Sequence, residues 1–385
     1  MNSPGVCYQV NMQLGFGGGE VYTVFFSRAL CELGWEVVLY VNRDNPHWVG
    51  RLPAGVRIVP LDGPEALLGA LPEGPVTLFF QTPQSAALIS ALHRLGHCCC
   101  IFVHMPLYGR NPAVFSSFDY VVAVSRHVIA SLQVAGITTL HPVPLLGVAD
   151  LERGATINGE ITRGEIYDWD RRKVRERLSR AISPLLAPLL SRPRFSRRPG
   201  LTLGIVSRLT PIKQFPLLFS YLVPILEQES DIHLEIFGSG GYASVRDLRR
   251  TLRPLTGRYR FWGQQQDVRA VYGQLDALLT GLPEKEALGL NVIEAQVCGL
   301  PVLAVDAPPF DETVADGLTG WRYTDPRKDG GRDFQRVLCL LREGLDSDPE
   351  LVKQHLSSFS FQAFVYRVDC LMGAVSVLPE VNHAS

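Results

Sequence analysis

Short apolar runs bounded by turn residues alternate with segments of helical periodicity along most of the chain. This alternation is typical of parallel sheets whose faces are covered by helices. The predicted strands of the first half are residues 6–12, 35–41, 76–81, 98–105 and 119–125, with a helix at 20–34. The same alternation begins again in the second half, with predicted strands at 201–207, 232–238, 259–263, 277–282 and 301–305, and helices at 216–228 and 291–299. The pattern therefore predicts an α/β protein with two Rossmann-like domains.

The pattern changes between the two halves. Over residues 151–198 the periodic strands stop, and the composition shifts to Arg, Pro and Ser. After residue 348 one more helical pattern follows, at 362–378, with no strand behind it. We therefore predict four parts: an N-terminal Rossmann-like domain at 1–150, a basic linker segment at 151–198, a C-terminal Rossmann-like domain at 199–360, and a C-terminal helix at 361–385 that packs back towards the N-terminal domain.

Composition narrows the class of protein. Of the 385 residues, 46% are hydrophobic and 19% are charged, which excludes a mainly disordered chain. The 37 basic residues balance 38 acidic ones, so the global positive charge of a nucleic-acid-binding protein is missing. No apolar run reaches about 18 residues, and the start lacks the basic and apolar regions of a secretory signal. Because most of the eight cysteines lie in apolar runs, we expect a reduced, cytoplasmic protein.

Two glutamates with seven residues between them, Glu286 and Glu294, frame the start of a predicted helix. If the helix begins near Leu290, the amides of Gly289, Leu290 and Asn291 lack helical partners and form a site for an anion. Ionised carboxylates only accept hydrogen bonds, which suits them to paired hydroxyl groups. Taken alone, such a pair is more often two solvated side chains beside a surface helix.

Three more polar side chains lie at the ends of predicted strands. Arg208 and Lys213 follow the predicted strand at 201–207. His104 lies near the end of the predicted strand at 98–105. Ligands of parallel sheets bind at the carboxyl ends of the strands, so we expect these side chains at a binding edge. The alternatives are a solvated surface for the two cations and a core position for the histidine.

A glycine-rich loop follows the first predicted strand. Gly17, Gly18 and Gly19 open the helix there, so their backbone amides are accessible to an anion. A nicotinamide dinucleotide binds a similar loop, but the G-x-G-x-x-G fingerprint is only partly present and the second strand ends without an acidic residue. An NAD-dependent oxidoreductase is therefore the weaker interpretation.

The segment from Glu286 to Glu294 resembles the motif E-G-F-G-L-x-x-x-E-A of the retaining glycosyltransferases of family 4, although Ala and Leu replace its Gly-Phe pair. Residues 207–213 resemble the family's G-R-L-x-x-x-K-G segment, with Ser207 and Gln214 in place of the two glycines. Residues 17–20 fit its G-G-x-E segment. The resemblance implies the GT-B fold, in which two Rossmann-like domains face each other across a cleft.

The resemblance also implies roles for these residues. Glu294 would bind the ribose of a nucleotide, and Glu286 would bind hydroxyls of the transferred sugar. Arg208 and Lys213, with the helix-start amides, would neutralise charge on the departing diphosphate, which is electrostatic stabilisation of the transition state. The C-terminal domain would therefore bind the nucleotide sugar.

The N-terminal domain would lie on the acceptor side, with the glycines of residues 17–19 facing the donor phosphate and His104 near the transferred sugar. The implied reaction moves a sugar from a UDP- or GDP-linked donor to a hydroxyl of a growing cell-surface glycan, lipid-linked or lipopolysaccharide, with retention of configuration. It needs no metal, no further cofactor and no protein nucleophile, because the leaving phosphate takes the acceptor proton. A GT-B sugar epimerase or phosphorylase and a non-catalytic GT-B scaffold remain as alternatives.

The predicted linker is rich in arginine. Its basic residues, against the single acid Glu176, are Arg171, Arg172, Lys173, Arg175, Arg177, Arg180, Arg192, Arg194, Arg197 and Arg198. Val174, Leu178, Ile182 and Leu185 add an apolar stripe at helical spacing. The stretch between Arg171 and Ile182 is either a solvated linker helix or a contact with the anionic inner face of the cell membrane. A third alternative is that the arginines pair with acids of either domain.

Two sequence patterns, at residues 93–100 and 168–170, contain the residue types of metal sites. His93 and His97 precede Cys98, Cys99 and Cys100, but successive strand residues point to opposite faces and would not all reach one ion. The D-x-D pattern at residues 168–170 lies in the linker zone, away from any predicted strand end. We therefore predict no metal site.

Overall fold

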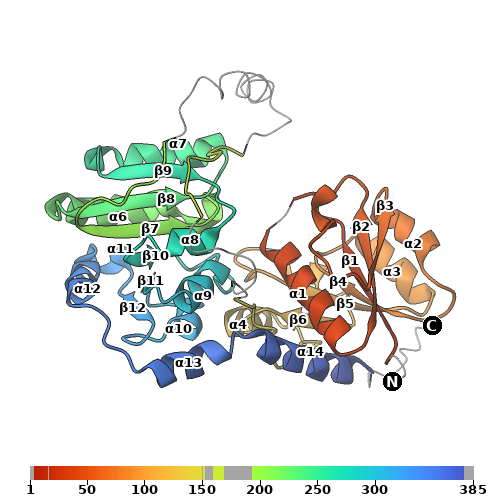
Figure 1. The fold of residues 1–385 in the computed structure, drawn as a ribbon. Coiled ribbons are helices and arrows are strands. Elements are labelled where there is room, and N and C mark those ends of the chain that lie inside the picture. The colour runs from red at the N-terminus through yellow and green to blue at the C-terminus, as the bar shows by residue number, and fades with distance from the viewer. Residues whose placement is uncertain (1–3, 16, 150, 152–158, 169–192, 377–385) are drawn as a thin grey trace, which may run out of the picture. The chain divides into compact units, whose positions relative to one another are not determined.

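The computed structural model describes residues 4–15, 17–149, 151, 159–168 and 193–376, and the chain divides into two compact units (Figure 1). The N-terminal unit is Met1–Ala149 together with Ser357–Ser385, and the C-terminal unit is Asp150–Leu356. Each unit contains one parallel sheet of six strands with helices on its faces, which confirms the predicted α/β class with two Rossmann-like domains.

The sheet of the N-terminal unit has the strand order β3-β2-β1-β4-β5-β6. Its strands are β1 (Val6–Asn11), β2 (Glu36–Asn42), β3 (Val56–Leu61), β4 (Thr77–Phe80), β5 (Cys98–Val103) and β6 (Tyr120–Ala123). The helices of this unit are α1 (Gly18–Glu32), α2 (Leu67–Ala70), α3 (Ala86–Arg94), α4 (Arg126–Val134) and α14 (Phe361–Ser376). The order reverses between β1 and β4, where Gln9 pairs with Phe79, so the ligand-binding crevice of such a sheet is expected at the carboxyl ends of these two strands.

The C-terminal unit repeats this arrangement with the order β12-β11-β10-β7-β8-β9. Its strands are β7 (Leu201–Val206), β8 (Ile232–Phe237), β9 (Tyr259–Gly263), β10 (Ala277–Leu279), β11 (Val302–Val305) and β12 (Gly320–Tyr323). Its helices are α6 (Phe215–Gln228), α7 (Tyr242–Thr251), α8 (Val268–Tyr272), α9 (Leu290–Val297), α10 (Phe310–Thr313), α11 (Pro326–Asp329), α12 (Arg332–Glu343) and α13 (Pro349–Ser357). The reversal falls between β7 and β10, where Leu203 pairs with Ala277.

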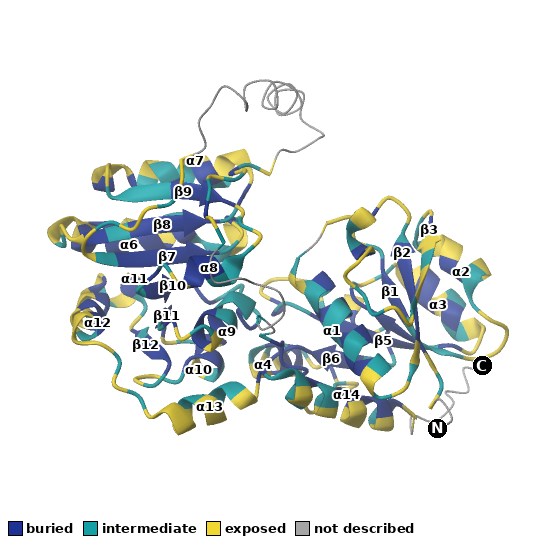
Figure 2. Cartoon of the chain, viewed as in Figure 1, coloured by how far each residue is buried: buried dark blue, intermediate teal, exposed yellow. Residues whose placement is uncertain are grey.

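Apart from the partly exposed edge strand β3, the strands are nearly continuous apolar runs because both faces of each sheet are covered. In β7, Leu203 and Ile205 face one hydrophobic cluster, to which α6, α7 and α12 contribute, while Val206 faces a second cluster built with α8, α9 and α10. Figure 2 shows the consequence, with buried sheets and exposed residues on the outer sides of the helices. This two-sided burial holds the carboxyl ends of the strands in fixed positions.

The last helix of the described chain, α14, packs on α1 within the N-terminal unit. Phe364 contacts the rings of Tyr22 and Phe25, with each pair of ring centroids 6.3 Å apart. The guanidinium of Arg28 lies 4.5 Å from the ring centroid of Phe361. The amphipathic pattern near the end of the sequence therefore covers a face of the first helix, an arrangement that pattern alone does not specify.

Parts of the predicted linker belong to the C-terminal unit. The amide of Gly164 donates to the carbonyl of Trp262 over 2.7 Å, and the amide of Gln264 donates to the carbonyl of Glu165 over 3.0 Å. Gly164 and Glu165 thus pair with the backbone at the end of β9, the outermost strand of the sheet. The predicted membrane segment, residues 171–182, lies outside the described residues.

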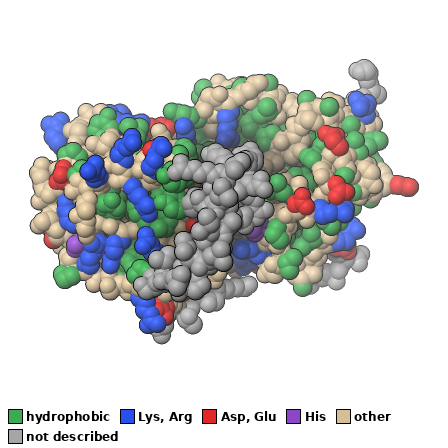
Figure 3. Space-filling view, turned by 90° about the horizontal axis from the view of Figure 1, so that it is seen from above, with side chains coloured by type: hydrophobic (Ala, Val, Ile, Leu, Met, Phe, Trp, Pro, Cys, Tyr) green, Lys and Arg blue, Asp and Glu red, His purple; other side chains and the backbone are tan. Residues whose placement is uncertain are grey.

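Three described arginines of the predicted linker form ion pairs within the C-terminal unit, one of them with another linker residue, Glu160. Arg194 pairs with Glu160, Arg197 with Asp276, and Arg198 with Glu235. These contacts match the alternative that linker arginines bind acids of a domain. In the view of Figure 3, Lys and Arg side chains nevertheless outnumber Asp and Glu over the C-terminal unit, on the left.

No helix within the described part of the chain is long and apolar enough to cross a membrane.

Candidate active site

The loops after β7 and β10 meet at the point where the strand order of the C-terminal sheet reverses. The loop after β7 contains a single 3-10 turn, Pro211–Lys213, and leads into α6. The ammonium of Lys213 forms an ion pair with the carboxylate of Glu286, which belongs to the loop after β10. Both side chains are largely buried, with 19% and 15% of their surfaces exposed. Two predicted site residues that are 73 positions apart are therefore in direct contact.

Arg208 lies at the start of the same loop, but it is more open to solvent. Its side chain is 63% exposed, and one guanidinium nitrogen lies 3.8 Å from a carboxylate oxygen of Asp168. An ion pair of this length between exposed groups contributes little free energy. Arg208 is thus available for a stronger anionic partner at the carboxyl end of β7.

Glycines after β8 allow the loop after β7, which carries Arg208, to pack closely against them. A Cβ atom on Gly238 would lie 1.9 Å from the carbonyl oxygen of Ser207, and one on Gly240 would lie 2.2 Å from that of Leu209. Gly238 also has a φ of +136°, which residues with side chains rarely adopt. The glycine run after β8 is therefore a tight structural turn that supports the loop carrying Arg208.

Glu294 and the start of α9 form the second half of the site. The helix begins at Leu290, directly after Gly289, whose φ of +84° favours glycine. The hydroxyl of Tyr272 donates a hydrogen bond of 3.1 Å to Glu294. Burial raises the pKa of Glu294 to about 7, because a low-dielectric surrounding disfavours the charged carboxylate, and the bond from Tyr272 opposes this only in part. Glu294 is thus fixed in orientation and sensitive to pH near neutrality.

In the N-terminal unit, the structure brings His104 and the glycine loop together. His104 follows β5, and its Cδ2 atom lies 3.6 Å from the position that a Cβ on Gly19 would occupy. Its Nε2 atom donates to the side-chain oxygen of Gln81 over 2.8 Å, while no described residue contacts Nδ1 by a hydrogen bond. Burial lowers the pKa of His104 to about 4, so the ring is neutral at pH 7. Nδ1 is itself buried, so the hydrogen bond to Gln81 and the surrounding packing hold the ring as a neutral group.

Glu20 has a structural function that the sequence did not reveal. Its carboxylate accepts the amide of Gly17 over 2.8 Å and contacts the side-chain amide of Asn11 at 3.4 Å. The capping carboxylate sits three residues after the N-cap Gly17, as in a capping box. Gly18 is the first residue of α1, so all three predicted loop glycines lie at this helix start.

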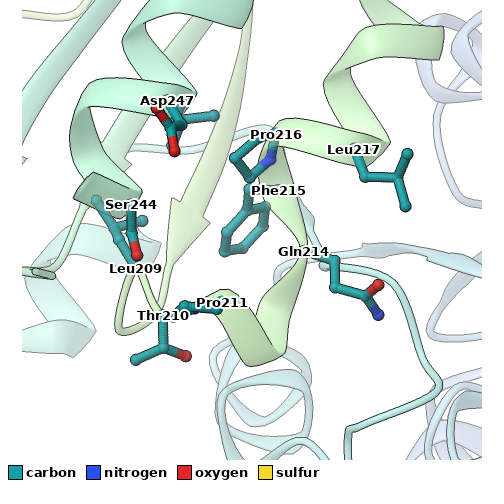
Figure 4. A pocket seen from close by; sticks show the side chains of 10 residues that line it. Leu209, Thr210, Pro211, Gln214, Phe215, Pro216, Leu217, Ser244 and Asp247 are labelled. Carbon is teal, nitrogen blue, oxygen red and sulfur yellow. The ribbon is translucent and has the colours of Figure 1, made fainter.

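A pocket of about 240 Å³ lies beside the turn that carries Lys213, between α6 and α7 (Figure 4). Its lining residues are Leu209, Thr210, Pro211, Gln214, Phe215, Pro216, Leu217, Ser244, Asp247 and Leu248. Neither Arg208 nor Lys213 lines it. In Figure 4 the side chain of Gln214 extends away from Ser244 and Asp247.

The histidines and cysteines of residues 93–100 do not all lie together in the structure. His93 and Cys99 converge with Asp119, and their possible ligand atoms lie within 4.8 Å of one another. Asp119 is hydrogen-bonded to His93 over 3.0 Å and to the amide of Cys99 over 2.7 Å, whereas His97 accepts the amide of Val76. This cluster of His93, Cys99 and Asp119 therefore includes an aspartate that was not part of the sequence pattern.

The position predicted for the D-x-D pattern was wrong. The amide of Asp168 donates to the carbonyl of Gly240 over 2.8 Å, which places Asp168 directly beyond the end of β8 and beside Arg208. The cause is the pairing of residues 159–168 with the sheet edge, which the composition of that segment did not indicate. The other two residues of the pattern lie outside the described residues.

Two six-stranded parallel sheets, each with one reversal of strand order, make this a two-domain α/β protein of the GT-B class. The chain superposes on the crystal structure of Anabaena HepE in complex with UDP and glucose with a TM-score of 0.68, at 15% identity, over 98% of this chain and 100% of that one. The apo lipopolysaccharide outer core galactosyltransferase WaaB gives a TM-score of 0.63 at 15% identity, over 96% of this chain and 99% of that one. The predicted GT-B fold is confirmed.

Residues 200–341 match the family described as Glycosyl transferases group 1, which confirms the resemblance to glycosyltransferases in the C-terminal unit. Over 153 residues the chain is 31% identical to a GDP-mannose-dependent monoacylated alpha-(1-6)-phosphatidylinositol monomannoside mannosyltransferase of Corynebacterium glutamicum. This match spans 37% of the chain and 37% of that relative. The family match and the named relative support an enzyme of the glycosyltransferase class.

Proposed function

We propose that the protein is a retaining glycosyltransferase that moves a sugar from a nucleotide diphosphate sugar to a hydroxyl of a growing cell-surface glycan. The observation that carries this proposal is the convergence of Lys213, Glu286 and the start of α9 at the strand-order reversal of the C-terminal unit. A cation and helix-start amides suit a diphosphate, and a neighbouring carboxylate suits sugar hydroxyls. The match to glycosyltransferases over the same residues supports it.

In this proposal the donor lies along the carboxyl edge of the C-terminal sheet. Arg208, Lys213 and the amides of Gly289, Leu290 and Asn291 bind the diphosphate, and Glu294 accepts hydrogen bonds from the ribose hydroxyls. The base is uracil or guanine: HepE was solved with UDP, and the mannosyltransferase relative is named as GDP-mannose-dependent.

The proposed chemistry breaks the bond between the anomeric carbon and the diphosphate oxygen and forms a bond to the acceptor oxygen on the same face. The electron pair leaves with the diphosphate, whose oxygen takes the acceptor proton, so atoms and charges balance without a protein nucleophile. Arg208 and Lys213 neutralise the growing charge on the leaving group, which stabilises the transition state. We propose no role for a metal ion in this step.

The N-terminal unit contributes neutral groups in this proposal. The glycines Gly17, Gly18 and Gly19 allow backbone amides to approach the donor phosphate without steric hindrance. His104 is neutral at pH 7, so in this proposal it lies near the transferred sugar as a neutral ring rather than as a cation.

The proposed acceptor is lipid-linked or part of a lipopolysaccharide. Support comes from the names of the two relatives, a phosphatidylinositol mannoside mannosyltransferase and a lipopolysaccharide galactosyltransferase. We further propose a cytoplasmic protein that docks on the inner face of the membrane through residues 171–182. Near an anionic surface each Lys or Arg contributes about 1 kcal/mol, which falls off within a Debye length.

The decisive experiment measures nucleotide binding and turnover. Calorimetry with UDP and GDP and mass spectrometry of UDP- and GDP-sugar turnover should reveal one productive donor, and EDTA should leave the rate unchanged. Binding of NAD with no binding of either nucleoside diphosphate would contradict the proposal. A product that keeps its nucleotide but has an inverted sugar centre would favour an epimerase.

Docking is tested separately by co-sedimentation with phosphatidylglycerol vesicles at low and high salt. A variant with Glu at Arg171, Arg172, Arg175 and Arg177 should lose the binding that the wild type shows at low salt. Equal sedimentation of both proteins would remove the membrane contact and leave the donor site untouched.

A further inference from the structure

Gln214 occupies a backbone conformation that glycine adopts more easily. It follows the 3-10 turn Pro211–Lys213 and precedes α6, with φ 53° and ψ 29°. Among the described residues, only Gln214 and Tyr108 are non-glycine residues with positive φ. A side chain costs conformational energy there, and such strain persists where surrounding contacts determine the conformation. The contacts of this side chain are therefore informative.

The amide of Gln214 connects to a chain of charged groups. Its Nε2 atom donates to a carboxylate oxygen of Glu284 over 2.9 Å, and the other oxygen of Glu284 is paired with the guanidinium of Arg327. Asp325 accepts two bonds from Nε of the same guanidinium, of 2.9 and 3.0 Å. Asp325 also accepts the backbone amide of Arg327 over 2.9 Å, so the far end of this chain is anchored to the first turn of α11.

These contacts run beside the pair of Lys213 and Glu286. Gln214 directly follows Lys213 in the sequence, and Glu284 precedes Glu286 by two residues. The backbone amide of Leu282 donates to the carbonyl of Lys213 over 3.2 Å. A Cβ on Gly281 would lie 2.2 Å from that carbonyl, so the two loops are in close backbone contact. Two side-chain contacts thus join the same two loops: the ion pair of Lys213 with Glu286, and the hydrogen bond of Gln214 with Glu284.

We propose that Gln214, Glu284 and Arg327 form a positioning relay that holds Lys213 and Glu286 in register for catalysis. None of the three is assigned a contact with the donor, so they act through the pair. This inference rests on the proposed function, because the pair matters only if it binds the donor diphosphate and sugar. It adds residues of this chain that the glycosyltransferase motif does not include, since the motif has glycine where Gln214 stands.

Charge balance explains why the relay needs Arg327. Its guanidinium compensates the carboxylates of Asp325 and Glu284, and these contacts raise its pKa and lower that of Asp325. If Arg327 is removed, Glu284 becomes an uncompensated acid two residues from Glu286. Lys213 would then have two competing carboxylates, and its ammonium would move away from the position it holds now. Removing the charge of Glu284 as well should relieve that competition.

The first test is Gln214→Gly, because glycine tolerates the backbone angle but lacks the hydrogen bond. We expect the melting temperature to stay equal or rise, while kcat for nucleotide-sugar turnover falls about tenfold and the donor KM changes by less than about threefold. A merely structural residue would lower stability together with activity. If kcat stays within about twofold of the wild type, the relay is wrong.

The second test is a cycle of Arg327→Gln, Glu284→Gln and the double variant. We expect Arg327→Gln to lower kcat more than Glu284→Gln does, and the double variant to recover part of the loss, since the uncompensated acid is gone. Additive losses would overturn the competition and with it the relay. The matched control is Arg342→Gln, which removes a guanidinium that also pairs with two acids, Glu229 and Asp231, and should leave kcat unchanged.

The two proposals fail in different ways. A wild type that neither binds UDP or GDP nor turns over a nucleotide sugar overturns the proposed function, and the relay falls with it. An active wild type whose Gln214→Gly variant is equally active overturns the relay alone.

Discussion

The two units have the same strand order, yet their binding edges differ in charge. In the C-terminal unit, Arg208, Lys213 and Glu286 follow β7 and β10, and all of them are charged groups. In the N-terminal unit, the corresponding edge holds the glycine loop after β1 and the neutral His104 after β5. The shared topology therefore predicts ligand binding at the same edge of both sheets, while the loop residues give the two edges different chemistry. In the proposed reaction, the charged side chains bind the diphosphate, whereas the N-terminal edge contributes only backbone amides to the donor phosphate and the neutral ring of His104 near the transferred sugar.

The largest effect expected from this difference is at Lys213. Loss of one preorganised donor from a transition state typically lowers kcat by about 10²–10³, so we expect a loss of this size for Lys213→Ala. Steady-state turnover of the productive nucleotide sugar measures it. Lys353→Ala, which removes an exposed lysine of α13, is the control. If kcat of Lys213→Ala stays within about tenfold of the wild type, Lys213 does not stabilise the transition state as proposed.

The next effect concerns glycines at the two edges. We expect Gly238→Ala to lower the free energy of unfolding by about 2–3 kcal/mol, because of its positive φ and the 1.9 Å approach to the carbonyl of Ser207. Gly19→Ala should cost less than about 0.5 kcal/mol, since its Cβ would meet the ring of His104 at an ordinary 3.6 Å. Urea denaturation of both variants checks this contrast. Equal stabilities would show that the loop of the charged edge is less constrained than its geometry indicates.

A smaller effect is expected from pH at Glu294. Its pKa of about 7 means that the carboxylate becomes protonated as the pH falls through neutrality. A protonated carboxyl accepts ribose hydroxyls poorly, so the donor KM should rise about tenfold between pH 8 and pH 6. Glu294→Gln should raise the KM at pH 8 and remove this pH dependence. A wild-type KM that is constant over this range would separate Glu294 from donor binding.

The smallest effect is expected at His104. Its pKa of about 4 keeps the ring neutral from pH 5 to 8, so it should add no step to the pH profile. His104→Phe removes the hydrogen bond to Gln81 and should lower kcat/KM by about 3- to 10-fold at every pH in this range. Profiles of kcat/KM for both proteins test this. If the variant lost a titration step near neutrality, the N-terminal edge would be charged after all.

Several local features were predictable because they depend on neighbours in the sequence. The strand runs, the helix that begins at Leu290 and the placement of Arg208 behind β7 follow from periodicity and turn residues. Glu20 was less accessible to prediction, because a capping carboxylate and a ligand-binding carboxylate have the same sequence pattern.

The sequence by itself determined the two-sheet α/β plan and a set of residues at strand ends, since burial on both faces forces continuous apolar runs and sheet geometry brings the loops behind parallel strands to one edge. Only the tertiary structure decided which of these residues touch. Three contacts join positions about 70 to 100 apart in the chain: Lys213 with Glu286, Gln214 with Glu284, and Gly164 with Trp262 at the end of β9. The physical reason is that such contacts depend on loop paths and side-chain conformations set by packing in three dimensions, which no local pattern encodes.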